Sequence, residues 1–213
     1  GFEDSFAGVQ RVALETNSAL DETGTLFSRL AKASQEGGMA AAAAQERALG
    51  LTQTINQTIQ LSGGSADSAK AAITQLIQGL QSGVLRGEEF NAVMEQAPRL
   101  AQAMAQGLGV TTGELRALAG QGALTAETVM KALEGQADAV AGEFAKLPPT
   151  VGRALQNLST QWTLYVGEAD KGLISSANAA KVIDALAANL DMLVGTLTSA
   201  GKVWAAFKIA GLA

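Results

Sequence analysis

Three glutamates near the middle of the chain are the first residues whose types and spacing could do chemistry. Glu88, Glu89 and Glu95 fall in one predicted helix. A glycosidase needs two carboxylates on opposite sides of a cleft, one of them held protonated by apolar surroundings. Glu88 and Glu89 are adjacent at a helix start, where the helix dipole favours acidic side chains. We therefore interpret them as helix-terminal residues rather than as catalytic ones.

The composition excludes most other kinds of site. The 213-residue sequence contains no Cys and no His, so it offers no disulfide, thiolate or imidazole chemistry. No glycine-rich stretch follows a predicted strand or ends in Gly-Lys-Ser or Gly-Lys-Thr, as a phosphate-binding loop would. No acidic residues show the spacing of a calcium loop. We expect no catalytic, cofactor-binding or metal-binding residues, no cofactor and no enzymatic activity.

The composition favours a helical protein, and the charge argues against sequence-specific binding of nucleic acid. The formal net charge is −5 and the basic residues are scattered singly, whereas nucleic-acid binding needs clustered Lys and Arg. Hydrophobic residues make up 47% of the chain but aromatic residues only 4%. Chains rich in Ala and Leu form closely packed helices. The predicted fold class is all-α, with a compact module of short helices flanked by long amphipathic, coiled-coil-like helices.

The first predicted part, residues 1–61, consists of long helices or a helical hairpin. Apolar residues recur at three-, four- and seven-residue steps through residues 3–34, with Gly24 as a predicted kink. A second helix is predicted over residues 39–61. The apolar stripe suits either an αα-hairpin or parallel helices from several copies. Its members are Phe6, Val9, Ala13, Leu20, Phe27 and Leu30.

The second predicted part, residues 62–147, is a compact multi-helix module. Five short helical segments lie between residues 61 and 133, each bounded by Gly, Pro or a capping Ser or Thr. One helix is predicted to run from Thr125 to Phe144. We interpret Met94, Met104 and Met130 as core fillers. The residues predicted to mark the starts of helices are Ser65, Pro98, Thr111 in a capping box with Glu114, and Thr125.

The third predicted part, residues 148–213, consists of long Ala- and Leu-rich helices. Pro148 disfavours helix at the preceding residue, so a boundary is predicted there. Trp162 and Tyr165 lie three residues apart on one helix face, which suits either packing or a partner contact. Both ends of the chain look cut, and we expect a fragment of a longer polypeptide.

Several motifs in a fixed order resemble the N-terminal conserved region of tail tape measure proteins of long-tailed, siphovirus-like bacteriophages or prophages. The resemblance covers about residues 60 to 175 and depends on the order and spacing of the motifs together. The motifs include residues 62–66 (SGGSA), 76–83 (LIQGLQSG), 87–90 (GEEF), 94–98 (MEQAP) and 122–125 (GALT).

The resemblance implies a structural role in a virion. Such proteins lie in the tail lumen in several copies, with a trimer favoured, and occupy the host cytoplasm during assembly. Their length sets the number of tube rings, and they leave ahead of the DNA at ejection. The implied partners are the chain itself, the tail tube protein, distal tail or tip hub proteins, tail assembly chaperones and, for the full-length protein, the host membrane.

Two further readings compete with the tape measure. One is a cytosolic helical scaffold or adaptor without enzymatic activity, and the other is an accessory wall hydrolase module, which the missing His and Cys oppose. The residues predicted to contact another copy or a partner are Phe6, Val9, Phe27, Leu30, Trp162, Tyr165, Leu186, Leu190, Leu193 and Trp204.

Overall fold

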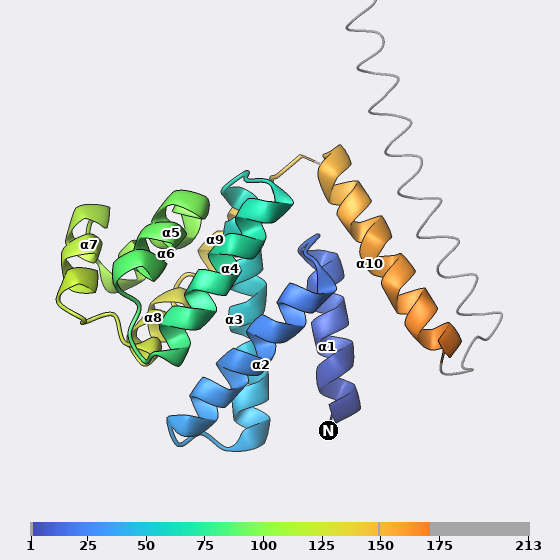
Figure 1. Cartoon of the computed structure of the whole chain (residues 1–213), viewed down its shortest axis with the longest axis horizontal. Helices are drawn as coiled ribbons and strands as arrows, with labels where there is room; N and C mark the ends of the chain where they lie inside the picture. Colours follow the sequence, from blue (N-terminus) through green and yellow to red (C-terminus); the bar gives the residue numbers. More distant parts are fainter. Residues whose placement is uncertain (1, 149, 171–213) are drawn as a thin grey trace, which may run out of the picture. The chain divides into compact units, whose positions relative to one another are not determined.

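The computed structural model describes residues 2–148 and 150–170, and within that part of the chain the fold is all-α, as predicted. Figure 1 shows short helices packed around the long α3. The only strand-like pairing in the described residues is one isolated antiparallel bridge between Val84 and Thr125. The helices are α1 (Phe2–Glu15), α2 (Leu20–Glu36), α3 (Ala41–Leu61), α4 (Ala66–Gln81), α5 (Gly87–Gln96), α6 (Pro98–Leu108), α7 (Thr112–Gly120), α8 (Ala126–Glu134), α9 (Ala137–Phe144) and α10 (Val151–Asp170).

The helix starts predicted from capping residues are confirmed. Ser65 accepts a hydrogen bond from the backbone N–H of Ser68 at the start of α4, and Thr125 does the same at α8. Thr111 and Glu114 form the expected reciprocal capping box at α7, and Pro98 is the first residue of α6. Local side-chain chemistry therefore fixes these boundaries.

The apolar core runs from α2 and α3 through α4 to α9. Leu76, Phe90, Leu100 and Leu115 are all fully or almost fully buried in it. The core fillers are also confirmed, since Met104 and Met130 are buried and Met94 packs against the same cluster. The α4–α5 and α7–α8 connections lie against each other at the isolated bridge between Val84 and Thr125. There the backbone N–H of Leu85 donates to the carbonyl oxygen of Leu124 at 2.8 Å.

Two glycines allow the closest approaches in the core. A Cβ on Gly107 of α6 would overlap the carbonyl oxygen of Ala132 in α8. A Cβ on Gly79 of α4 would collide with the side chain of Leu85. Both glycines lie inside helices, where they cost helical stability, and the close packing explains why they are there.

Two helices expected to be continuous are each divided in two. Gly24, the predicted kink, lies inside α2, and the first helical block is divided instead by the turn between Thr16 and Ala19. The helix expected from Thr125 to Phe144 is split into α8 and α9 by Gly135 and its neighbour. In both places a single residue suited to ending a helix, Asn17 in a left-handed conformation or Gly135 at the C-cap of α8, interrupts a continuous apolar pattern.

The structure groups the chain into two compact units. Among the described residues, 2–16 and 20–147 belong to the first, and 17–19 with 148 and 150–170 belong to the second. The core of the first unit includes Leu51 of α3 and Leu76 of α4, so it continues across the boundary predicted between residues 61 and 62. The three-part division stays a prediction, since residues 171–213 lie outside the described residues.

Candidate functional site

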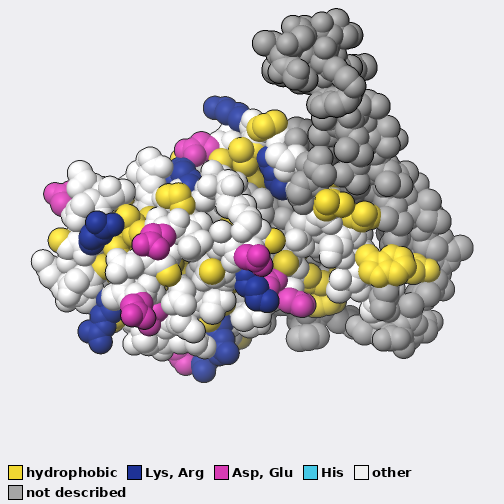
Figure 2. Space-filling view, turned by 45° about the horizontal axis from the view of Figure 1, so that its top comes forward, with side chains coloured by type: hydrophobic (Ala, Val, Ile, Leu, Met, Phe, Trp, Pro, Cys, Tyr) yellow, Lys and Arg dark blue, Asp and Glu magenta, His cyan; other side chains and the backbone are white. Residues whose placement is uncertain are grey.

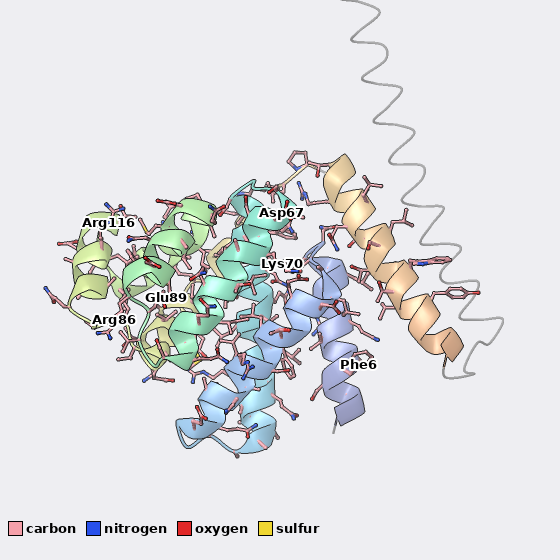
Figure 3. All side chains as sticks on the ribbon, viewed as in Figure 1. Phe6, Asp67, Lys70, Arg86, Glu89 and Arg116 are labelled. Carbon is pink, nitrogen blue, oxygen red and sulfur yellow. The ribbon has the colours of Figure 1, made fainter. Side chains whose placement is uncertain are left out.

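The contact residues predicted in the N-terminal part have different surroundings. Phe6 lies on α1 with 42% of its side chain exposed (Figure 3). Val9 and Leu30 are buried within the chain's own fold, and Phe27 packs partly buried against the core. In this conformation Phe6 is therefore the residue of the four with the most surface to offer a partner. A contact role for all four stays a prediction.

The aromatic pair on α10 forms a local apolar face. The rings of Trp162 and Tyr165 lie 5.8 Å apart between centroids at an angle of 38°. Trp162 is 56% exposed and Leu155 is 50% exposed. Together with Leu158 they follow the three- and four-residue steps of a coiled-coil seam. The other predicted contact residues, Leu186, Leu190, Leu193 and Trp204, lie outside the described residues.

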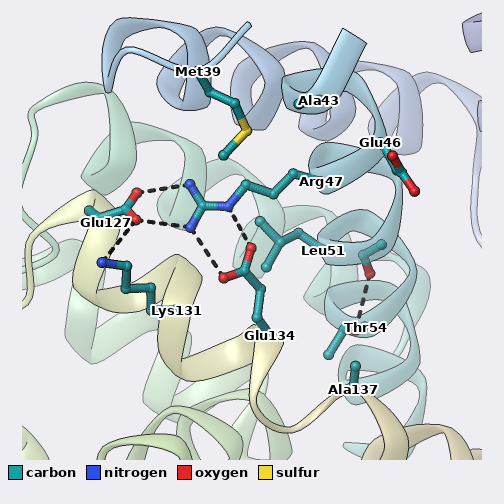
Figure 4. Close-up of a pocket in the computed structure, with 11 residues that line it drawn as sticks. Met39, Ala43, Glu46, Arg47, Leu51, Thr54, Glu127, Lys131, Glu134 and Ala137 are labelled. Carbon is teal, nitrogen blue, oxygen red and sulfur yellow. Dashed lines mark hydrogen bonds and ion pairs between the residues drawn. The ribbon is translucent and has the colours of Figure 1, made fainter. Parts of the chain in front are cut away.

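A shallow groove of about 590 Å³ lies between α3 and the pair α8 and α9 (Figure 4). Apolar atoms of Ala43, Leu51 and Ala137 form much of its wall, and Arg47 crosses it. The Arg47 side chain is only 11% exposed. The sequence analysis did not identify this groove, because its residues come from helices that are far apart in the chain.

Arg47 joins α3 to both ends of α8 through two carboxylates. Its Nη1 and Nη2 donate to Glu127 at 2.9 and 3.0 Å, and its Nε and Nη2 donate to Glu134. Lys131 adds a 3.5 Å ion pair with Glu127. Because Arg47 donates to it, the pKa of Glu127 lies below its ordinary 4.5. These carboxylates raise the pKa of Arg47, with the hydrogen bond to Glu134 as the larger cause.

A second, smaller arginine clamp holds α9. The nearly buried Arg99 of α6 donates from Nε and Nη2 to the two carboxylate oxygens of Glu143, both at 2.8 Å. The hydrogen bond from Arg99 lowers the pKa of Glu143. The backbone N–H of Arg99 also donates to the hydroxyl of Ser62 at 3.1 Å, which ties the start of α6 to the end of α3. Both arginines thus act as structural links between helices.

Hydroxyl and amide groups fill the junction of α1, α2 and α3. The Nδ2 atom of buried Asn56 donates to the hydroxyls of Thr16 and Thr23 at 3.3 and 3.0 Å. Nothing in the described part of the chain donates to the buried Oδ1 of Asn56. We call these three residues the polar seam. Buried amides and hydroxyls of this kind specify how helices pair more than they stabilise the pairing.

The face shown in Figure 2 carries no large area of one charge, and the described part of the chain holds no cluster suited to a metal. Acidic and basic side chains are intermixed on the face shown in Figure 2, without a large area of one sign. Within residues 2–148 and 150–170, no group of three or more acidic side chains is placed to hold a metal ion. No helix of that part is long and apolar enough to cross a membrane.

The fold defines a class, that of an all-α helical protein whose helices are linked by buried arginines. The sequence profile of the tape measure protein family matches residues 1–171, about four-fifths of the chain. The chain therefore belongs to the tape measure protein family, and its place is in a phage tail. Searches of curated proteins and of solved structures found no significant match.

Proposed function

We propose that this chain is the folded N-terminal part of a tail-length ruler. Membership of the tape measure family carries the proposal. The helical architecture supports it, because an α-helix supplies length at about 1.5 Å per residue. In this proposal the full-length protein lies in the tail lumen, sets how many tube rings assemble and leaves ahead of the DNA at ejection. The host cytoplasm is where it assembles.

The proposed partners are those of such a ruler. They are further copies of the chain, with a trimer favoured, together with the tail tube protein, distal tail or tip hub proteins and tail assembly chaperones. The host membrane is a proposed contact of the full-length protein during ejection. The net charge of −5 and the intermixed charges on the face shown in Figure 2 support a role without sequence-specific nucleic acid binding. No enzymatic step is proposed.

The ruler proposal is tested by changing the length of the full protein in its phage. Deleting about 70 residues of uninterrupted downstream helix is expected to shorten the tail by about 100 Å, at the helical rise. Electron microscopy of purified virions measures tail length directly. A matched duplication of the same segment should lengthen the tail by the same amount. Tails of unchanged length in both variants would overturn the proposal. If the deletion variant forms no tails, the tail length of the duplication variant alone tests the proposal.

We further propose that the α10 face is a contact between copies. Leu155 and Trp162 are about half exposed and lie seven residues apart, so they fall on the same face of α10. Their coiled-coil spacing suits a second copy of the same helix. Replacing Trp162 with Ala should lower the self-association measured by sedimentation velocity. Thr163→Ala, at the adjacent exposed position, is the matched control and should leave it unchanged.

A further inference from the structure

The helix α10 is amphipathic in the reverse of the usual sense. Its buried positions carry small or polar side chains, since Ala154 is 2% exposed and Thr160 is 1% exposed. Asn157 lies between them at three-residue steps on the same face, and its Oδ1 atom is buried. The opposite face carries Leu155 and Trp162, the two most exposed large apolar side chains of the described residues. A helix held by apolar burial alone would be turned the other way.

Thr160 uses its hydroxyl differently from a threonine on the outer face of the same helix. Inside a helix, a Thr hydroxyl commonly donates to the carbonyl oxygen four residues earlier, and Thr163 does so to Ser159 at 3.0 Å. Thr160 instead donates to the carbonyl oxygen of Ser18, 142 residues away in the sequence, at 3.3 Å. Thr160 and Ser18 are both buried. This hydrogen bond therefore ties α10 to a distant part of the chain rather than to its own backbone.

The acceptor of this hydrogen bond is available because the chain turns at Asn17. Helix α1 ends at Glu15 and α2 begins at Leu20, so the Ser18 carbonyl lies outside both helices. In one continuous helix that carbonyl would accept from the backbone N–H four residues later. Asn17, with φ = 53°, makes the turn that prevents this. Residues 17–19 also belong to the same compact unit as α10. The α1–α2 connection thus supports α10.

A hydrogen bond is suited to setting the rotation of a helix about its own axis. Apolar burial is not directional, whereas a hydrogen bond weakens steeply when its donor moves out of line. Successive residues of an α-helix are separated by about 100° around the axis, since 3.6 residues make a turn. A rotation of α10 by a single position would therefore carry the Thr160 hydroxyl away from the Ser18 carbonyl.

We infer that the hydrogen bond from Thr160 to Ser18 is an anchor that sets the rotation of α10. The anchor keeps Leu155 and Trp162 facing outward, where a second copy can pack against them. Thr160 is a positioning residue, because its side chain is buried and lies on the opposite face from these two. The purpose of the anchor rests on the proposed contact between copies. The rotation itself concerns one chain and is measured without a partner.

The rotation is tested by the exposure of Trp162 in dilute, monomeric chains. The sequence has two Trp residues, so Trp204→Phe leaves Trp162 as the only indole, and acrylamide quenching of its fluorescence measures its exposure. Thr160→Val removes the hydroxyl but keeps the side-chain shape. The quenching constant is expected to fall, because a helix free to turn buries its large apolar residues. Thr163→Val loses only a bond within α10 and should leave the quenching constant unchanged.

Self-association of the full chain is the second measurement. By sedimentation velocity, Thr160→Val should weaken it about two- to tenfold, the range expected from one net hydrogen bond. This loss is expected although the variant leaves the outer face chemically intact. Thr160→Ser keeps the hydroxyl and should retain both the quenching constant and the self-association of the parent chain.

Several results would overturn the inference. One is an unchanged quenching constant in Thr160→Val, and another is an increased one, because α10 would then detach or unfold instead of turning. Equal losses in Thr160→Ser and Thr160→Val would show that the hydroxyl is not the anchor. If Trp162→Ala leaves self-association unchanged, the proposed contact between copies fails, while the quenching of Trp162 still decides whether Thr160 sets the rotation.

Discussion

The helices on either side of α3 are packed by different chemistry. On one side, α4 to α8 bury large apolar side chains such as Phe90 and Leu100 in a continuous core. On the other, α1 meets α2 and α3 through small apolar residues and the polar seam. Apolar burial supplies stability, whereas buried hydrogen bonds supply specificity with little net stability. We therefore expect the module to unfold as one body and α1 to separate before it.

The largest expected effect comes from truncating the module core. Phe90→Ala removes a buried aromatic side chain and should cost about 3 to 5 kcal/mol of unfolding free energy. Urea denaturation followed by far-ultraviolet circular dichroism measures this loss. Val12→Ala, at an equally buried position of α1, should move the main transition far less. Equal losses in the two variants would contradict the proposed difference between the regions.

A close helix contact gives the next largest effect. Gly107→Ala forces a methyl group into the backbone of α8 and should cost about 1 to 3 kcal/mol through overpacking. Gly142→Ala in α9 has open space around the added Cβ, and it should stabilise the helix by up to about 1 kcal/mol. Opposite signs of the two shifts in thermal midpoint would support the close approach of α6 and α8.

Removing the arginine that crosses the groove should have a smaller, pH-dependent effect. Arg47→Met keeps the packing but loses charged hydrogen bonds, and should cost about 1 to 2 kcal/mol near neutral pH. That range allows for solvent screening, because Glu127 and Glu134 are 46% and 39% exposed.

The sign of the pH dependence follows from the lowered pKa of Glu127. A carboxylate with a depressed folded-state pKa contributes stability above its unfolded value near 4.5, and loses it as the pH falls through the folded value. Wild-type and Arg47→Met stabilities should therefore converge below that range. A constant difference from pH 7 down to acid unfolding would contradict the assigned role of Arg47.

The smallest expected effect on global stability comes from the polar seam itself. Asn56→Leu removes two hydrogen bonds but also removes a buried oxygen without a partner, and it adds apolar contact. These changes should offset one another to within about 1 kcal/mol. The urea midpoint checks this, and a loss comparable to that of Phe90→Ala would show that the seam belongs to the stabilising core.

The sequence was informative wherever structure is set by local chemistry. Ser65, Pro98, Thr111 and Thr125 act as predicted because a cap or a proline acts within one turn of helix. The resemblance to tape measure proteins, based on short motifs with Gly and Pro at fixed places, led to the correct family.

Features that depend on distant residues were not predictable in the same way. Arg47 pairs with carboxylates 80 and 87 residues away, and Asn56 meets hydroxyls 33 and 40 residues away. The turn at Asn17 depends on a single Asn in a left-handed conformation, which is a weaker helix-stop signal than Gly, and the sequence analysis placed the interruption at Gly24 instead.

Native-state hydrogen exchange in increasing urea tests the difference between the two regions most directly. Amides of α1 should exchange through a local opening. The free energy of that opening should depend only weakly on urea and should be well below the global unfolding free energy. Amides of α6, beside the core residue Leu100, should exchange only through the steep global transition. Plotted against urea concentration, the exchange free energies of α1 and of α6 should fall on two separate lines that merge only near the unfolding midpoint. A single steep line shared by α1 and α6 at every urea concentration would contradict it.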